Sequence, residues 1–407
     1  MEIEIRLCTR AQLPDFMRTL EGAFGHDISG ENIEEHLHVM DAERMHGAFD
    51  GDALVGTAGV YPFTFTIPGG RVPAAGVTMV GVLPSHRRKG ILTKMMKFQL
   101  DDAPARGEPI AVLWASEDLI YQRFGYGMAS VQGQIDVPRD RAAFLRDEGP
   151  IGRTRLIDVD EALKVLPSVY DRVAETQPGM FARTPEWWRY HRLRDPEDRR
   201  RGGGPLWHAV LEIEGRPEAY ALYRVFSNWE GGVNTGYTQV EEAMGTSARA
   251  TREIWRFAFG IDLMERVKAW LLPPDHPLML STAEPTRLRF AQVDTFWLRV
   301  VDVPAALGAR SYASDDSVVF DVNDSFCSWN AGRHRLVTDE GRGEVEPASG
   351  DPDLLVDVTD LATTYLGAYS FTQLVRAGRV AEAKPGAAAR ADAMFRTSFA
   401  PWCPEIF

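Results

Sequence analysis

The sequence predicts a mixed α/β fold, and three observations support this fold class. Strand-like and helix-like apolar patterns alternate over residues 1–140. The run 110–114 is continuously apolar, as expected for a central strand covered on both faces. A second alternating pattern of helices and strands begins near Thr154.

The length and composition indicate several globular domains. At 407 residues the chain is long enough for two or three of them. Hydrophobic residues make up 44% of the chain and charged residues 25%. This composition supports full cores and excludes a disordered, collagenous or disulfide-scaffold protein.

Apolar spacing predicts the elements of the first 140 residues. Strands are expected at 2–7, 77–82 and 110–114, and helices at 13–20 and 91–100. A hairpin over 47–61 turns at Asp50-Gly51, and a second hairpin turns at Gly69-Gly70. The strand at 77–82 ends at Pro84, and a basic turn then leads into the helix.

The later part of the chain continues the α/β pattern after a charged, proline-flanked linker at 138–150. It contains expected helices at 165–170, 249–258, 358–366 and 370–377, strands at 207–213, 218–224, 267–272, 298–303 and 317–322, and an acidic turn-rich region at 339–353. The predicted domains therefore cover 1–150, 151–290 and 291–407.

The charge balance excludes two classes of partner. The chain has 45 Lys and Arg against 58 Asp and Glu, so its formal charge is 45 − 58 = −13. Non-specific binding to nucleic acid or to an anionic membrane requires net basic surface, so neither partner is expected. A cationic partner would be attracted instead.

Cysteine and histidine spacing predicts no metal site. Cys8, Cys327 and Cys403 lie far apart, and the histidines near the N-terminus match no structural zinc pattern. Residues 1–6 lack the basic and apolar regions of a signal peptide. The sequence therefore predicts a cytoplasmic protein in a reducing compartment.

The sharpest local feature is the basic glycine turn between the strand at 77–82 and the helix at 91–100. It reads Arg87-Arg88-Lys89-Gly90 and opens directly onto the helix. The first N–H groups of a helix have no intrahelical partner and lie at the positive end of its dipole, so a pyrophosphate can bind there. The alternative is a solvated basic turn that merely begins an amphipathic helix.

This turn resembles the coenzyme A loop of the GCN5-related N-acetyltransferase (GNAT) superfamily, Arg/Gln-x-x-Gly-x-Gly/Ala, with Arg87, Gly90 and Leu92 at the motif positions. Residues 115–127, Ala-Ser-Glu-Asp-Leu-Ile-Tyr-Gln-Arg-Phe-Gly-Tyr-Gly, and 399–407, Phe-Ala-Pro-Trp-Cys-Pro-Glu-Ile-Phe, are similar to one branch, the enhanced intracellular survival (Eis) acetyltransferases. Leu92 departs from the small residue of the superfamily but agrees with this branch.

The resemblance implies two GNAT-like domains followed by a sterol-carrier-protein-like domain. The middle domain contains no coenzyme loop between a strand and a helix, so no coenzyme is expected there. The resemblance also implies acetyl-CoA as co-substrate and a homohexamer. The coenzyme contacts carried over are Met79, Val80, Gly81, Val82, Arg87, Arg88, Lys89, Gly90, Ile91 and Leu92.

Two catalytic roles also come from the resemblance. Tyr126 matches the general acid, and a tyrosine with a pKa of about 10 keeps its proton at neutral pH and can donate it to a thiolate. Phe407 would supply its α-carboxylate, with a pKa of about 3.5, as the general base. The alternatives are a tyrosine that packs in the core and a frayed chain end, although the apolar residues of 395–407 disfavour fraying.

The implied reaction is acetyl transfer to amines of polycationic small molecules such as aminoglycosides, at several positions of one acceptor, which would confer antibiotic resistance. Phe24, Asp27 and Glu405 are the expected acceptor contacts, although each acidic residue could equally be an ordinary surface carboxylate. One alternative acceptor is a lysine side chain or a natural polyamine. An alternative of another class is a lipid- or ligand-binding module with a degenerate acetyltransferase domain.

Overall fold

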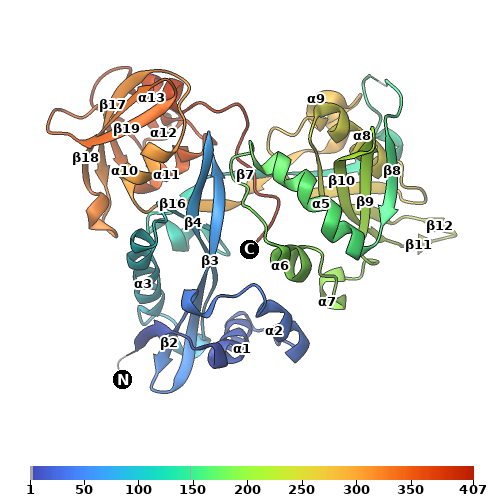
Figure 1. The fold of residues 1–407 in the computed structure, drawn as a ribbon, viewed down its shortest axis with the longest axis horizontal. Coiled ribbons are helices and arrows are strands. Elements are labelled where there is room, and N and C mark those ends of the chain that lie inside the picture. Colours follow the sequence, from blue (N-terminus) through green and yellow to red (C-terminus); the bar gives the residue numbers. More distant parts are fainter. Residues whose placement is uncertain (1–2, 147) are drawn as a thin grey trace. The chain divides into compact units, whose positions relative to one another are not determined.

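A computed structural model describes residues 3–146 and 148–407 of the chain (Figure 1). Its contacts divide the chain into two compact units. Unit 1 contains Met1–Ser130, Thr295–Ser398 and Ile406–Phe407, and unit 2 contains Val131–Asp294 and Phe399–Glu405.

The first sheet of unit 1 has seven strands in the order β1-β2-β3-β4-β5-β16-β6. Their bounds are β1 Glu4–Leu7, β2 Met45–Asp50, β3 Ala53–Ile67, β4 Gly70–Val82, β5 Ile110–Trp114, β16 Phe296–Val300 and β6 Gly127–Met128. The β2–β3 and β3–β4 hairpins confirm the predicted turns at Asp50-Gly51 and Gly69-Gly70. Strands β4 and β5 run parallel, whereas the other neighbouring strands of this sheet pair antiparallel.

Along the first 130 residues, helices alternate with these strands in the chain. They are α1 Leu13–Phe24, α2 Gly30–His36, α3 Ile91–Ala105 and α4 Asp118–Gln122. Helix α3 forms the crossover from β4 to β5, as the apolar spacing predicted, and buries Met95, Met96 and Leu100. Met96 and Leu100 pack with Val77 and Leu113. Met95 belongs to a second core cluster, with Ala48 and Ala58.

Strand β16 differs from the expected organisation, because it lies in the first sheet although the sequence analysis placed residues 298–303 in the third segment. It lies between β5 and β6, with Leu298 opposite both Val112 and Gly127. All five of its residues are buried. Pairing on both edges and burial of both faces explain this position, which spacing along the chain could not reveal.

A second sheet forms the centre of unit 2. Its order is β15-β7-β14-β13-β10-β9-β8, with β15 Ala291–Asp294, β7 Val131–Pro138, β14 Arg266–Leu272, β13 Tyr237–Gly245, β10 Arg216–Phe226, β9 Trp207–Ile213 and β8 Arg153–Ile157. Strand β7 precedes the predicted linker and nevertheless pairs with β14 and β15. The parallel pair β13–β14 matches β4–β5 of the first sheet.

Helices cover both faces of the second sheet. They are α5 Val159–Ala174, α6 Pro185–Trp187, α7 Glu197–Arg200, α8 Ala248–Phe259 and α9 Leu278–Ser281, with a small hairpin of β11 Trp229–Glu230 and β12 Val233–Asn234. On one face, Ile254 and Trp255 of α8 pack with Val240 and Ala269. On the other, Leu166 of α5 belongs to a separate core cluster.

The remainder of unit 1 is a third sheet with helices. Its order is β19-β18-β17-β20-β21, with β19 Arg342–Pro347, β18 Gly332–Asp339, β17 Asp316–Asn323, β20 Leu354–Asp357 and β21 Ala381–Glu382, and with α10 Val303–Ala309, α11 Val358–Tyr365, α12 Phe371–Arg376 and α13 Ala387–Phe395. The predicted turn-rich region at 339–353 contains β19, because its polar residues form an exposed edge strand. Helix α11 packs against β6 and β16 of the first sheet.

Candidate active site

Strands β4 and β5 separate at one end of the first sheet. Their pairing runs from Ala74 to Val77 and ends where Val77 lies opposite Leu113. The other edge of β4 remains paired with β3 as far as Val82. The last five residues of β4, including Met79, Val80, Gly81 and Val82, are half-buried and have no strand partner on the β5 side among the described residues. Their open backbone edge can hydrogen-bond to an extended ligand.

A β-bulge fixes the direction of this open edge. Met79 has a φ of +55°, and the register between β3 and β4 shifts between Thr57 and Gly59. The Thr57 hydroxyl donates a hydrogen bond of 2.9 Å to the Met79 carbonyl oxygen. Bulges bend a strand and change the direction of its side chains and hydrogen-bonding groups. This bulge lies on the open edge of β4, where an extended ligand would bind.

The N-terminus of α3 is open to an anion. Gly90 is its N-cap residue, has a φ of +75°, and provides no side-chain cap. A Cβ atom at Gly90 would meet nothing within 4 Å, so this residue borders open space. Arg88 and Lys89 are exposed beside it, while Ile91 and Leu92 anchor the helix in the core. These residues fit the pyrophosphate of a coenzyme.

Arg87 differs from its two basic neighbours. Its Nε atom donates to the Val82 carbonyl oxygen at 3.1 Å, and its Nη2 atom donates to the Ala23 carbonyl oxygen at 2.6 Å. Ala23 lies in the last turn of α1, where carbonyl groups lack intrahelical partners. The Arg87 side chain therefore holds the loop against α1, and its coenzyme contact stays a prediction.

The matching helix of unit 2 is closed. The Ser247 hydroxyl caps α8 by accepting a hydrogen bond from the Ala250 N–H at 3.2 Å. The preceding Thr246 hydroxyl donates to the carboxylate of Glu218. A side-chain cap and a nearby negative charge occupy the position that is open at α3. This contrast supports the prediction that the middle domain has no coenzyme site.

Tyr126 lies immediately before β6 and is fully buried. Its hydroxyl oxygen has no hydrogen-bond partner among the described residues. Its ring packs at 6.0 Å from the ring of Tyr121, in the core cluster that also contains Val77 of β4. Burial raises the pKa of Tyr126 far above that of an ordinary tyrosine, and the charge of Arg299 lowers it by a smaller amount. Tyr126 therefore stays protonated at neutral pH and has a proton to donate.

Arg299 is a candidate residue that the sequence analysis missed. It lies on β16, is fully buried, and pairs with the carboxylate of Asp324. Its Nε and Nη1 atoms make no hydrogen bond within the part of the chain that the structure describes. The sequence does contain a signal for this residue, because Arg299 is the single charged residue in the apolar run 296–301. A buried charge of this kind needs a partner or a function.

Phe407 contacts the first sheet through its side chain. Its ring meets that of Phe63 edge-on, with centroids 4.8 Å apart. Phe63 lies opposite Ala74 in the β3–β4 register. The neighbouring register positions Val60 and Val77 point toward α3, so Phe63 and Phe407 lie on the other face of the sheet. The end of the described chain is therefore anchored on β3, and the base role of the Phe407 carboxylate stays a prediction.

Glu405 belongs to unit 2 and is already paired there. Its carboxylate is 2.8 Å from the Arg183 Nε atom and accepts hydrogen bonds from Trp187 Nε1 and His191 Nδ1, each at 2.9 Å. Burial alone would raise the pKa of Glu405, but Arg183 and His191 hold it below its usual range. Both oxygens are thus occupied by the chain itself, which argues against a direct acceptor contact and favours an anchor for 399–405.

Phe24 and Asp27 lie at the exposed end of α1. Phe24 is 52% exposed, and Asp27 is exposed with its Oδ1 atom accepting from the Ile28 N–H at 2.9 Å. The next turns carry exposed Glu31 and Glu34. An exposed aromatic ring and exposed carboxylates on the same short segment are suited to an organic cation.

Comparisons with known proteins decide the family. Two models described as an acetyltransferase (GNAT) domain match residues 4–129 and 179–300, and a sterol carrier protein domain matches 303–404. The N-acetyltransferase Eis of Mycobacterium tuberculosis is 33% identical over 358 residues, which cover 86% of this chain and 85% of the relative. The chain belongs to the Eis-like GNAT N-acetyltransferases.

Further relatives agree with this family. An uncharacterized N-acetyltransferase of Streptomyces avermitilis is 41% identical over 413 residues and covers 100% of both chains. The crystal structure of Eis1 from Mycobacterium abscessus matches with a TM-score of 0.86 and 33% identity over 100% of both chains. The predicted family, the fold of two GNAT domains followed by a sterol-carrier-like domain, and the N-acetyltransferase activity are confirmed. An acetyl-CoA-type co-substrate follows from the GNAT fold.

The described residues of this Eis-like N-acetyltransferase contain neither a metal-binding cluster nor a membrane-spanning helix. Within 3–146 and 148–407, no group of three or more His, Cys, Asp or Glu side chains is arranged to hold a metal ion. The expectation of a reaction without metal stays a prediction. In the same residues no helix combines the length and apolar character needed to span a bilayer.

Proposed function

We propose that this N-acetyltransferase uses acetyl-CoA to acetylate amines of polycationic small molecules such as aminoglycosides, at several positions where one acceptor carries several amines. The observation that carries the proposal is the open edge of β4, with the fully buried and unpartnered hydroxyl of Tyr126 in the core cluster beside it. The co-substrate supplies an acetyl thioester at this edge.

Tyr126 is the proposed general acid of the transfer. Its buried phenol keeps the proton at neutral pH, because its pKa is raised. The charge of the Arg299 guanidinium lowers the pKa of Tyr126 and would favour release of that proton during the reaction. Tyr126 can therefore deliver a proton to a departing thiolate without first losing it to solvent.

The α-carboxylate of Phe407 is the proposed general base. The contact between the rings of Phe407 and Phe63 holds this residue on β3, next to the strand whose edge is open. An α-carboxylate is ionised at neutral pH and can accept a proton from an ammonium group, either directly or through water.

The acceptor class rests on charge. The chain carries a net charge of −13, and exposed Phe24, Asp27, Glu31 and Glu34 lie in or near the first two helices. Carboxylates beside an aromatic ring attract an organic cation with more than one ammonium group. Glu405 is a proposed anchor of residues 399–405 within unit 2 and not a direct acceptor contact, because its carboxylate oxygens are paired with Arg183, Trp187 and His191.

A panel assay tests the acceptor. The purified chain is mixed with acetyl-CoA and an aminoglycoside, spermidine or a lysine peptide, and release of the coenzyme thiol is followed with the acetyl count by mass spectrometry. The proposal expects the highest kcat/KM for the aminoglycoside, with more than one acetyl group added. A higher kcat/KM for the peptide or for spermidine would replace the proposed acceptor by one of these amines.

A binding measurement separates catalysis from the module hypothesis. Calorimetric titration with acetyl-CoA is expected to show one site per chain. An absence of binding, together with an apolar ligand retained on purification, would favour a lipid-binding module with a degenerate acetyltransferase domain.

The remaining partners are also proposals. A homohexamer is expected, which light scattering would record as a mass six times the 45.4 kDa of one chain. Neither nucleic acid nor a membrane surface is a proposed partner, because both would be repelled by the net negative charge.

A further inference from the structure

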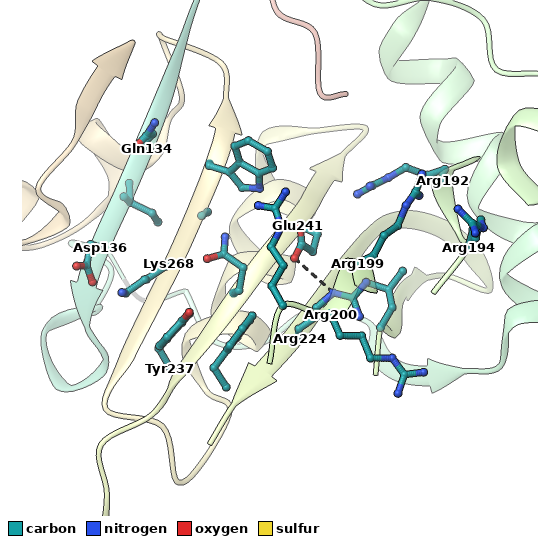
Figure 2. A pocket seen from close by; sticks show the side chains of 17 residues that line it. Gln134, Asp136, Arg192, Arg194, Arg199, Arg200, Arg224, Tyr237, Glu241 and Lys268 are labelled. Carbon is teal, nitrogen blue, oxygen red and sulfur yellow. Dashed lines mark ion pairs between the residues drawn. The ribbon is translucent and has the colours of Figure 1, made fainter. Parts of the chain in front are cut away.

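Unit 2 contains a large pocket that the acetyl-transfer site does not use. Its volume is about 670 Å³. Strands β7, β10, β13 and β14 form its floor, and residues 192–201, the basic segment, line its side (Figure 2). The register places Gln239, Lys268 and Asp136 on one face, whereas Val240 and its partners pack with α8 on the other. The pocket therefore lies on the sheet face opposite α8.

The lining of this pocket is strongly basic. Its cationic side chains are Arg192, Arg194, Arg199, Arg200, Arg201, Arg224 and Lys268. These seven cations face two lining carboxylates, Asp136 and Glu241. Asp136 is paired with Arg266 at 2.5 Å, and Glu241 lies 3.5 Å from Arg224. In a chain with a net charge of −13 this positive charge is local, and Arg199, Arg201 and Lys268 have no ion pair among the described residues.

The close approach of these cations is electrostatically unfavourable. Asp195 pairs with Arg224 at 2.5 Å and with Arg200 at 3.2 Å, so one carboxylate serves two guanidinium groups. Arg199 donates to the His191 carbonyl oxygen at 2.6 Å. Burial lowers the pKa of Arg199, and the charge of Arg194 lowers it further. Like charges held this close repel one another unless an anion lies between them.

Two guanidinium nitrogens near the pocket carry N–H groups without an acceptor among the described residues. Arg192 pairs through its Nε atom with Glu242 at 3.1 Å, but its Nη2 atom is buried without a hydrogen-bond partner among the described residues. The Nε atom of Arg200 is likewise buried and unpartnered within the described chain. Buried N–H donors are costly when unsatisfied, so the chain by itself leaves the positive charge of this segment incompletely paired.

The size and the wall of the pocket narrow the class of ligand. Small-molecule sites have volumes of about 300–1,000 Å³, which includes this one. Guanidinium groups bind phosphate through paired N–H donors. The opposite wall is aromatic: Tyr237 stacks on Phe226 at 4.6 Å, Lys268 Nζ lies 4.2 Å from the Tyr237 ring centre, and Trp270 also lines the pocket.

We propose that this anion pocket binds a small molecule with several adjacent phosphate groups. The arginines of the basic segment and Lys268 would hold the phosphates, while the aromatic wall would contact the rest of the ligand. The site is distinct from the proposed coenzyme site, whose β4 edge and α3 N-terminus belong to unit 1. A free oligophosphate and a nucleoside triphosphate share this chemistry.

The test is calorimetric titration of the full chain with inorganic tripolyphosphate and, separately, with ATP, without divalent metal and at about 0.05 M salt. Both probes are expected to bind, and binding is expected to weaken as the salt concentration rises. Equal affinities would assign the whole interaction to the phosphates. Tighter binding of ATP, with quenching of tryptophan fluorescence, would show that the aromatic wall around Trp270 also contacts the ligand.

Variants locate the bound probe. Arg201→Gln with Lys268→Gln removes two lining charges that have no ion pair in the described structure, and should weaken tripolyphosphate binding at least tenfold. The matched control, Arg216→Gln with Arg249→Gln, removes two exposed charges of the same unit that lie outside the pocket lining and should change the affinity less than twofold. Circular dichroism spectra confirm that both variants remain folded.

One further variant separates the two anion sites. Arg88→Glu alters the proposed coenzyme loop and should leave tripolyphosphate binding intact, whereas the Arg201–Lys268 double variant should keep wild-type acetyl transfer. The pocket proposal is overturned if wild type binds neither probe, if the control pair loses as much affinity as the pocket pair, or if Arg88→Glu alone abolishes binding. Failure of acetyl transfer would not affect these results.

Discussion

Arg299 lies directly against Gly125: a Cβ atom added at position 125 would come within 2.6 Å of the Arg299 Cζ atom. Gly125 also has a φ of +84°, which L-amino acids other than glycine rarely adopt. The residue before the proposed general acid is thus restricted by its backbone angle and by a buried guanidinium. The position of Tyr126 depends on both.

The first prediction concerns this contact. Gly125→Ala should lower the free energy of unfolding by about 2–4 kcal/mol, because backbone strain adds to the overlap with Arg299. Urea denaturation measures the change. Gly51→Ala is the matched control, since Gly51 has a φ of +61° with nothing within 4 Å of an added Cβ atom. It should cost only about 1 kcal/mol, and equal losses in the two variants would contradict the overlap.

A second prediction concerns the basic turn. Arg88→Glu should raise the KM for acetyl-CoA about tenfold or more with a smaller effect on kcat, because it places a negative charge at the open α3 N-terminus. Arg71→Glu, at the other end of β4, reverses an exposed charge away from the loop and should leave the KM unchanged. A similar KM in all three proteins would disprove the assignment of this turn.

Arg87 should behave differently from Arg88. Its side chain donates to the carbonyl oxygens of Val82 and Ala23, so Arg87→Met should lower the free energy of unfolding by about 1–3 kcal/mol. Thermal or urea unfolding measures this loss. A raised acetyl-CoA KM with unchanged stability would instead show that Arg87 acts on the coenzyme.

A further prediction follows from the pairing of Glu405. Glu405→Gln should lower the free energy of unfolding near pH 7 by about 3 kcal/mol, because it removes one of the two carboxylates that neutralise the buried Arg183, the other being Glu242. The folded-state pKa of Glu405 lies below the ordinary value of about 4.3. Its stabilisation is therefore complete above that pH and is lost as the pH falls through the folded-state pKa. The difference from wild type should narrow below about pH 4, and a constant difference between pH 7 and pH 3 would contradict this.

A fourth prediction concerns the chain end. Adding one alanine after Phe407 should lower kcat about 100-fold by displacing the α-carboxylate, while acetyl-CoA affinity stays within about twofold. Phe63→Leu should reduce kcat less, because it weakens the ring contact and keeps the carboxylate. Wild-type turnover in the extended chain would remove Phe407 from the mechanism.

Local patterns in the sequence predicted the elements that carry the coenzyme site. The β-branched strand ending at Val82, the glycine turn at Gly90 and the helical spacing from Ile91 onward depend on neighbours in the chain. Spacing alone reveals such features, because each is fixed by local backbone and side-chain preferences. Their roles in binding still came from the resemblance to a family.

Long-range pairings could not be predicted in this way. Arg299 reaches Tyr126 only because β16 inserts between β5 and β6. Glu405 meets Arg183 although 222 residues separate 405 from 183 along the chain. The basic segment was visible as a run of arginines, but its meaning depends on Lys268 and the sheet that lies opposite. Such contacts arise from tertiary structure, which a single sequence does not encode locally.

The most direct test of the account is the turnover of Tyr126→Phe with acetyl-CoA and an aminoglycoside, measured together with acetyl-CoA affinity. Tyr121→Phe is the control, because Tyr121 is a buried neighbour whose ring lies 6.0 Å from that of Tyr126. The account predicts that Tyr126→Phe loses about 100-fold or more in kcat, with affinity within about twofold and Tyr121→Phe close to wild type. A kcat for Tyr126→Phe equal to that of wild type would contradict it.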